Sequence, residues 1–165
     1  MKKYIAILSF LFTLNISADT MEIYNFTSYN LNYQFNTVDS STLSYPILWS
    51  TNTLLTLTPA VGFADYSNSG GYPFNPTGGT NNPAIVSWVR QTTSGGAQTA
   101  TSNTIAQTVF GSSQIIAFLK FSFTGLAFSG NWGPYGDFTY FDYNSGQVIL
   151  EYIDMGGGDA IFIAQ

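Results

Sequence analysis

The segment NLNYQFN at residues 30–36 decides the fold class. Leu31, Tyr33 and Phe35 alternate with Asn and Gln, so one face of the extended chain is apolar and the other carries only amides. A strict period of two predicts a β-strand with one face in a core and the other in solvent.

Further strand signals lie on both sides of this segment, at residues 21–26, 53–58, 84–90, 115–123, 138–143, 147–153 and 160–164. Glycine-bearing turns join the last three, which predicts a meander. One or two helical turns are predicted near residues 105–110, ended by Gly111, although Thr-rich sequence disfavours helix. Two polar stretches, residues 65–83 and 91–103, are predicted to be long loops.

Many short strands with almost no helix predict an all-β single domain. Its expected form is a two-sheet antiparallel β-sandwich of the jelly-roll or Greek-key kind. The rival is a small eight-stranded outer-membrane barrel, which this length and aromatic content permit. The chain ends on Gln165 instead of an aromatic, and the adjacent pair Ile115 and Ile116 breaks the alternation that such a barrel needs.

The N-terminus has the pattern of a bacterial secretory signal peptide. It combines Lys2 and Lys3, an apolar run at residues 4–14 and small residues ending at Ala18. We expect cleavage after Ala18, so that residues 1–18 leave and residues 19–165 form the mature domain. The product is then exported, to the cell surface, the medium or the periplasm. The apolar run is too short for a transmembrane helix.

Loss of the leader lysines changes the charge sum from 4 − 9 to 2 − 9, which is −7, and leaves Arg90 and Lys120 as the cations. So acidic a chain is a poor ligand for nucleic acid and for anionic lipid. The charged fraction of 8% is far below the usual quarter, about 25%. Neutral hydrogen-bonding side chains must therefore form the surface. Such a surface suits extracellular adhesive or carbohydrate-facing modules, but it suits a merely decorative module equally.

The chain has no histidine and no cysteine, which excludes triad hydrolases, disulfides and thiolate metal sites. Carboxylate chemistry remains. Asp142 and Glu151 lie on neighbouring strands of a predicted hairpin and could form the acid pair of a small glycosidase. Solvated strand positions explain both residues equally well, so we predict a protein that is not an enzyme.

The loop of residues 131–136, Asn-Trp-Gly-Pro-Tyr-Gly, is the strongest candidate binding segment, because exposed aromatic rings stack on sugars. The predicted ligand-binding residues are Asn131, Trp132 and Tyr135, joined by Tyr72 from the first long loop. In the alternative interpretation Trp132 plugs the end of the sandwich and Tyr135 packs under its own turn. The other tryptophans, Trp49 and Trp88, lie beside apolar runs and are predicted to be core.

Asp154 and Asp159 flank a glycine turn and could bind calcium through hard oxygen ligands. The alternative is that both are ordinary turn formers. Asn25-Phe26-Thr27 matches a glycosylation acceptor pattern but falls within a predicted strand, so the match is interpreted as chance.

Two functions fit these features. The first is a secreted binding or adhesion module that recognises a glycan or polysaccharide. The second is a structural subunit of a cell-surface layer or filament, because low charge leaves little repulsion against self-association. They differ in whether the mature chain assembles without a ligand.

Overall fold

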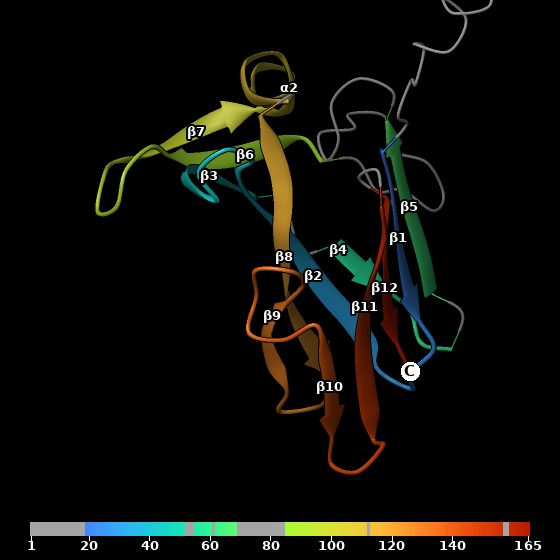
Figure 1. The fold of residues 1–165 in the computed structure, drawn as a ribbon. Helices are drawn as coiled ribbons and strands as arrows, with labels where there is room; N and C mark the ends of the chain where they lie inside the picture. Colours follow the sequence, from blue (N-terminus) through green and yellow to red (C-terminus); the bar gives the residue numbers. More distant parts are fainter. Residues whose placement is uncertain (1–18, 52–54, 61, 69–84, 112, 157–158) are drawn as a thin grey trace, which may run out of the picture.

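The computed structural model describes residues 19–51, 55–60, 62–68, 85–111, 113–156 and 159–165. The strands form two sheets that pack face to face (Figure 1), which confirms the predicted all-β sandwich. The five-stranded sheet has the order β10-β11-β12-β1-β5, and the seven-stranded sheet has the order β7-β6-β3-β2-β8-β9 with β4 also paired to β2. The described strands thus form two open sheets and not one closed sheet.

The strands of the five-stranded sheet are β1 (Asp19–Asn25), β5 (Gly62–Asn68), β10 (Tyr140–Tyr143), β11 (Val148–Gly156) and β12 (Asp159–Ala164). Those of the seven-stranded sheet are β2 (Asn30–Asp39), β3 (Ser44–Ser50), β4 (Leu55–Leu57), β6 (Ser87–Gln91), β7 (Gln98–Ser102), β8 (Gln114–Thr124) and β9 (Ser129–Trp132). Neighbouring strands are antiparallel, except that β1 and β12 pair in parallel. No helix in the described part of the chain is long and apolar enough to cross a bilayer.

The buried residues of β2 follow the alternation of residues 30–36. Leu31, Tyr33 and Phe35 in β2 are completely buried, as predicted. The phenol of Tyr33 meets that of Tyr66, from β5 in the other sheet, with 2.7 Å between the oxygens. Burial raises the pKa of both phenols well above the ordinary value.

Asn25 fixes the turn between β1 and β2. Its side chain is completely buried, and its amide nitrogen donates to the carbonyls of Tyr29, Leu57 and Thr58 at 2.8, 3.1 and 3.0 Å. Its oxygen accepts from the backbone nitrogen and hydroxyl of Thr27. A side chain so enclosed serves packing, in agreement with the interpretation that the glycosylation pattern here is chance.

Several strands lie where the sequence pattern predicted loops or gave no signal. The polar stretch 91–103 contains β7, so its prediction as a loop is wrong, and β5 includes residues 65–68 of the other stretch. Residues 69–83 of that stretch lie outside the described part. The predicted helix is confirmed as α2 (Asn103–Phe110), which starts at the N-cap Ser102.

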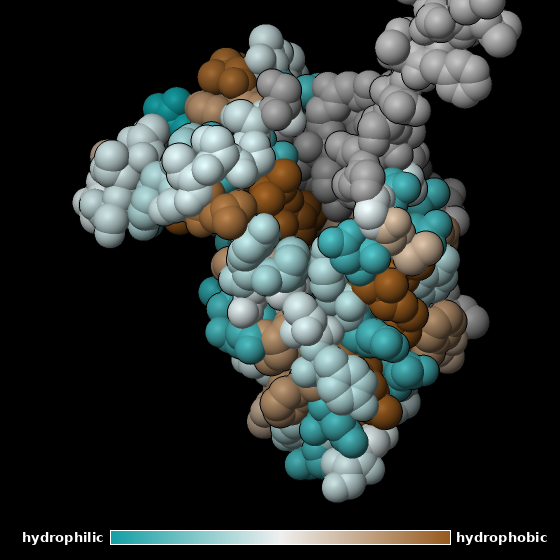
Figure 2. Space-filling model, in the orientation of Figure 1, coloured by the Kyte–Doolittle hydropathy of each residue, from teal (hydrophilic) through white to brown (hydrophobic). Residues whose placement is uncertain are grey.

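Strands β3, β6 and β7 extend beyond the five-stranded sheet as an arm, and α2 covers one face of it (Figure 1). Trp88 of β6 is buried there, and its indole nitrogen donates to the Asn103 side chain at 2.6 Å. The guanidinium of Arg90 lies 5.4 Å from the centre of the Phe110 ring. Figure 2 shows hydrophobic atoms in a recess beneath the arm.

Candidate functional site

The predicted loop of residues 131–136 contributes less aromatic surface than expected. Trp132 is 0% exposed, and its ring centroid lies 5.1 Å from that of Phe162 and 6.2 Å from that of Phe121. This is the packing alternative, so Trp132 is not available to stack on a ligand in this structure. Tyr135 is 49% exposed. Tyr72 lies outside the described residues.

The carboxylates of Asp154 and Asp159 do not converge. Asp154 pairs with the buried Ala160, whereas Asp159 precedes Ala160 and so points to the opposite face of the sheet. Asp154 accepts a hydrogen bond from the backbone nitrogen of Gly156 at 2.8 Å, and Asp159 accepts one from that of Thr20 at 2.6 Å. No group of three or more His, Cys, Asp or Glu side chains in the described residues could hold a metal ion.

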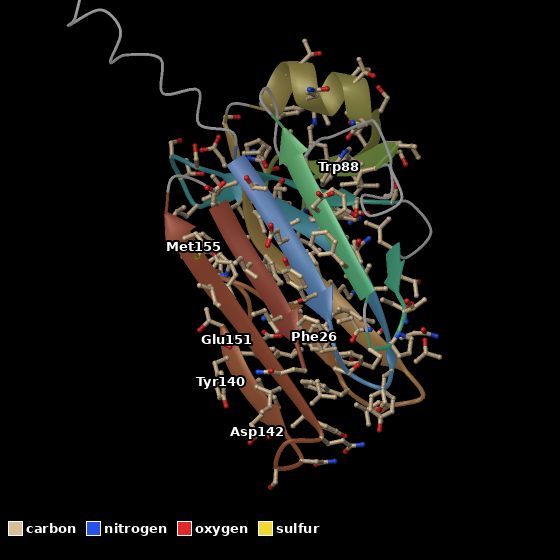
Figure 3. The ribbon with its side chains drawn as sticks, turned by 90° about the vertical axis from the view of Figure 1, so that its right-hand side faces the viewer. Phe26, Trp88, Tyr140, Asp142, Glu151 and Met155 are labelled. Carbon is tan, nitrogen blue, oxygen red and sulfur yellow. The ribbon has the colours of Figure 1, made fainter. Side chains whose placement is uncertain are left out.

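Asp142 and Glu151 lie on the same outer face of the five-stranded sheet but are not opposite one another (Figure 3). The partner of Glu151 across the β10–β11 ladder is Tyr140, and the partner of Asp142 is Ile149. The two acids are therefore diagonal neighbours. Asp142 also accepts a hydrogen bond from the backbone nitrogen of Gly146, the ordinary role of an Asp beside a turn.

The outer face of the seven-stranded sheet instead presents Trp49. Its neighbours Leu48 and Ser50 in β3 are buried on the inner face, so Trp49 points outward, where it is partly exposed. Asn36 of β2 and Val89 of β6 are its partners on either side. The prediction that Trp49 is core is wrong.

The register extends this row across five strands. Asn36 also pairs with Phe118 of β8, and Val89 pairs with Ala100 of β7. Five side chains therefore stand side by side on the outer face of the seven-stranded sheet, three of them on the arm: Phe118, Asn36, Trp49, Val89 and Ala100. This set is called the aromatic row below.

An adjoining row is polar. Lys120 of β8 pairs with Gln34 of β2 and with Asn131 of β9, so the three side chains share the outer face beside the aromatic row. Gln34 donates to the carbonyl of Ser50. Asn131 is a predicted binding residue that the register places on this face. Its backbone nitrogen donates to the carboxylate of the adjacent Asp137 at 3.0 Å.

These two rows combine partly exposed aromatic rings with amide donors and acceptors, and neither row holds a carboxylate. The arrangement suits a neutral, hydroxyl-rich ligand. The sequence indicated the amide face of β2 but not its neighbours, because the apolar residues Ile47, Leu48 and Trp49 follow one another and hide the alternation in β3.

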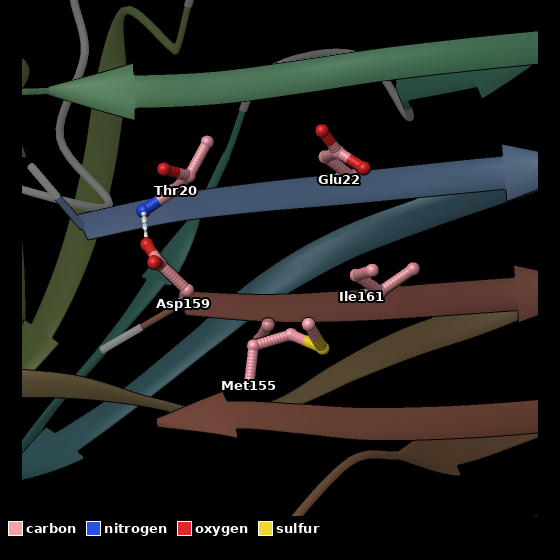
Figure 4. Close-up of a pocket in the computed structure, with 6 residues that line it drawn as sticks. Thr20, Glu22, Met155, Asp159 and Ile161 are labelled. Carbon is pink, nitrogen blue, oxygen red and sulfur yellow. Dashed lines mark hydrogen bonds between the residues drawn. The ribbon is translucent and has the colours of Figure 1, made fainter. Parts of the chain in front are cut away.

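A pocket lies on the outer face of the five-stranded sheet (Figure 4). It is a shallow pocket of about 200 Å³, lined by Thr20, Glu22, Met155, Asp159, Ala160 and Ile161. The Glu22 carboxylate accepts a hydrogen bond from the Tyr24 hydroxyl at 2.8 Å, which raises the pKa of Tyr24. Nothing in the sequence pattern predicted this pocket, because it depends on the parallel pairing of β1 with β12.

No protein-family model, curated protein or solved structure matches the chain.

Proposed function

We propose that the mature chain is an exported, non-enzymatic binding module that recognises a neutral polysaccharide on the outer face of the seven-stranded sheet. The observation that carries this proposal is the partly exposed Trp49, which stands between Asn36 and Val89 on the outer face of the seven-stranded sheet.

Aromatic rings and amide groups bind different parts of a sugar. The C–H groups of a sugar ring pack against the negative face of an indole or phenyl ring, and its hydroxyls pair with amide donors and acceptors. Trp49 and Phe118 stand two strands apart, roughly 10 Å from strand spacings. That separation suits successive units of an extended chain better than a single sugar.

The charge of the protein supports a neutral ligand. Lys120 is the one cation in the two rows, and the mature chain carries 2 − 9 = −7. Long-range repulsion disfavours an acidic polymer. Amides and hydroxyls keep their hydrogen-bonding capacity at any salt concentration, so we expect affinity to change little with ionic strength.

Affinity electrophoresis tests this proposal. The mature chain from Asp19 is run through gels containing a β-glucan, an α-glucan, a galactomannan or, as a negative control, the acidic polymer alginate. At least one neutral polymer should retard the chain. Trp49→Ala should weaken that retardation about tenfold or more, since an aromatic contact and its buried area are lost.

The matched control is Tyr140→Ala, which removes an aromatic side chain that is 59% exposed on the other sheet. It should leave retardation unchanged. Equal weakening by both substitutions, or no retardation by any neutral polymer, would contradict the proposal.

The structural-subunit alternative is favoured by one observation. β7 is an edge strand of the seven-stranded sheet with sequence QTATS, mostly exposed and without charge or proline. Such edges can pair with another chain. The size of the ligand-free chain in solution tests this alternative.

A further inference from the structure

The outer face of the five-stranded sheet, opposite to the proposed polysaccharide face, carries acidic side chains on every strand. Side chains alternate along each strand, and the outward positions include carboxylates from all five strands: Glu22, Asp65, Asp142, Glu151 and Asp159. The only Lys and Arg side chains among the described residues, Arg90 and Lys120, belong to the other sheet.

An apolar strip runs between these carboxylates. Its members are Ile149, Ile153, Ile161 and Ile163, continued on β1 and β5 by Tyr24 and Phe63, whose ring centroids lie 4.8 Å apart. The isoleucines point away from the core and are partly exposed. Two more apolar side chains, Phe26 and Met155, are 51% and 61% exposed on this sheet (Figure 3).

Two acidic side chains repel one another when nothing covers this face of the sheet. Glu22 of β1 and Asp65 of β5 stand directly opposite one another in the ladder. Like charges in such a position repel and destabilise the sheet. A cationic group above the pair would turn this repulsion into attraction.

We propose that this face docks a cationic amphipathic segment of a partner protein. Its apolar side chains would cover the isoleucine strip, and its Lys or Arg side chains would meet the flanking carboxylates. A second copy of the same face is a poor occupant, because two sets of carboxylates would be brought together. An anionic lipid surface is excluded by the same repulsion.

The size of the strip indicates the form of the occupant. From β11 to β5 the strip crosses three strand spacings, roughly 14 Å. A helix of about three turns has a similar length, at about 1.5 Å per residue. A short amphipathic helix laid across the strands would therefore reach from β11 to β5 over Ile163, Tyr24 and Phe63, which share one register row.

The test uses the mature chain and three labelled peptides of about 14 residues. The first is an amphipathic Lys/Leu helix, the second has Glu in place of every Lys, and the third has the Lys/Leu composition in an order that is not amphipathic. Fluorescence anisotropy should show binding of the first alone, weakening as salt rises from about 0.05 M to about 0.5 M.

Two classes of variant separate the contributions. Glu22→Gln and Glu151→Gln keep shape and remove charge, and each should weaken binding up to about fivefold. Ile163→Ser should weaken it about tenfold through lost apolar burial. Asp39→Asn, a charge-matched change in the other sheet, should have no effect. Circular dichroism and thermal unfolding verify that each variant is folded.

Three results would overturn the proposal. The first is equal binding of the amphipathic and non-amphipathic Lys/Leu peptides, which would mean charge attraction alone. The second is binding that survives both the Gln and the Ser substitutions. The third is a ligand-free dimer that Ile163→Ser dissociates, which would make a second copy the occupant.

Discussion

Asn25 ties three chain segments together through one buried amide. We expect Asn25→Ala to lower the free energy of unfolding by about 3 kcal/mol, because the carbonyls of Leu57 and Thr58 lose a donor and the Thr27 hydroxyl loses one acceptor. Urea denaturation of the mature chain measures this change. Asn32→Ala, which removes an amide with exposed hydrogen bonds to Thr56 and Thr124, is the control and should cost well under about 1 kcal/mol.

The buried phenols of Tyr33 and Tyr66 make stability sensitive to alkaline pH. Both have a folded-state pKa above the ordinary value of 10.0, because burial penalises the phenolate. Their contribution to stability is fully present below about pH 10 and is lost as pH rises through the raised values. We expect the two phenolates to appear only together with unfolding, which ultraviolet absorbance and circular dichroism measure in parallel.

A mutant cycle tests the same pair. Tyr33→Phe should cost about 1–2 kcal/mol because it leaves the Tyr66 hydroxyl buried without a partner. The double change to Phe should cost less than the single one. If the double variant loses stability at alkaline pH as much as the wild type does, groups other than these two phenols cause that loss.

For individual residues, the sequence predicted burial in the core better than it predicted the candidate site. The alternation of Leu31, Tyr33 and Phe35 gave their burial correctly. Exposure of tryptophans was harder to predict, because it depends on which strands pair. Trp132 lies in a glycine-rich loop sequence yet is buried, and Trp49 lies in an apolar run yet faces outward.

Among the elements, α2 depends on a single polar cap. The Ser102 hydroxyl accepts from the backbone nitrogen of Ile105 at 3.3 Å, and the first turn holds no acidic residue. We expect Ser102→Ala to cost about 1 kcal/mol. Ser102→Asp should retain or slightly raise stability, since a carboxylate also caps and favours the positive helix end. A melting temperature of Ser102→Ala equal to or above that of Ser102→Asp would contradict this capping role.

Strands with clear alternation or flanking turns, such as β2, β8, β11 and β12, could be predicted from the sequence. Four others, β3, β5, β7 and β9, could not. β7 consists of Gln, Thr, Ala and Ser, so it lacks an apolar face to signal a strand, and its ladder with β6 defines it. The parallel contact of β1 with β12 joins the two ends of the domain, a pairing that local patterns do not encode.

Over the whole molecule, the two proposed surfaces lie on opposite outer faces of the sandwich. They should therefore act independently. Trp49→Ala should leave binding of the Lys/Leu peptide unchanged, and Glu22→Gln should leave polysaccharide binding unchanged. Polysaccharide and peptide should also bind the same molecule together, which sedimentation of a ternary complex measures.

We expect the ligand-free mature chain to be monomeric in size-exclusion chromatography with light scattering, with or without calcium. Higher oligomers that form without ligand and disappear in Gln98→Lys, which adds a charge to the β7 edge, would favour the structural subunit over the binding module.

Acrylamide quenching of tryptophan fluorescence tests most directly whether polysaccharide covers Trp49. Trp88 and Trp132 are 0% exposed, so Trp49 should be the quenchable tryptophan, and Trp49→Phe should remove most of the quenching. With the polysaccharide that retards the chain in gels, the account predicts that quenching of the wild type falls toward the level of Trp49→Phe. Quenching that stays unchanged while the polysaccharide is bound would contradict it.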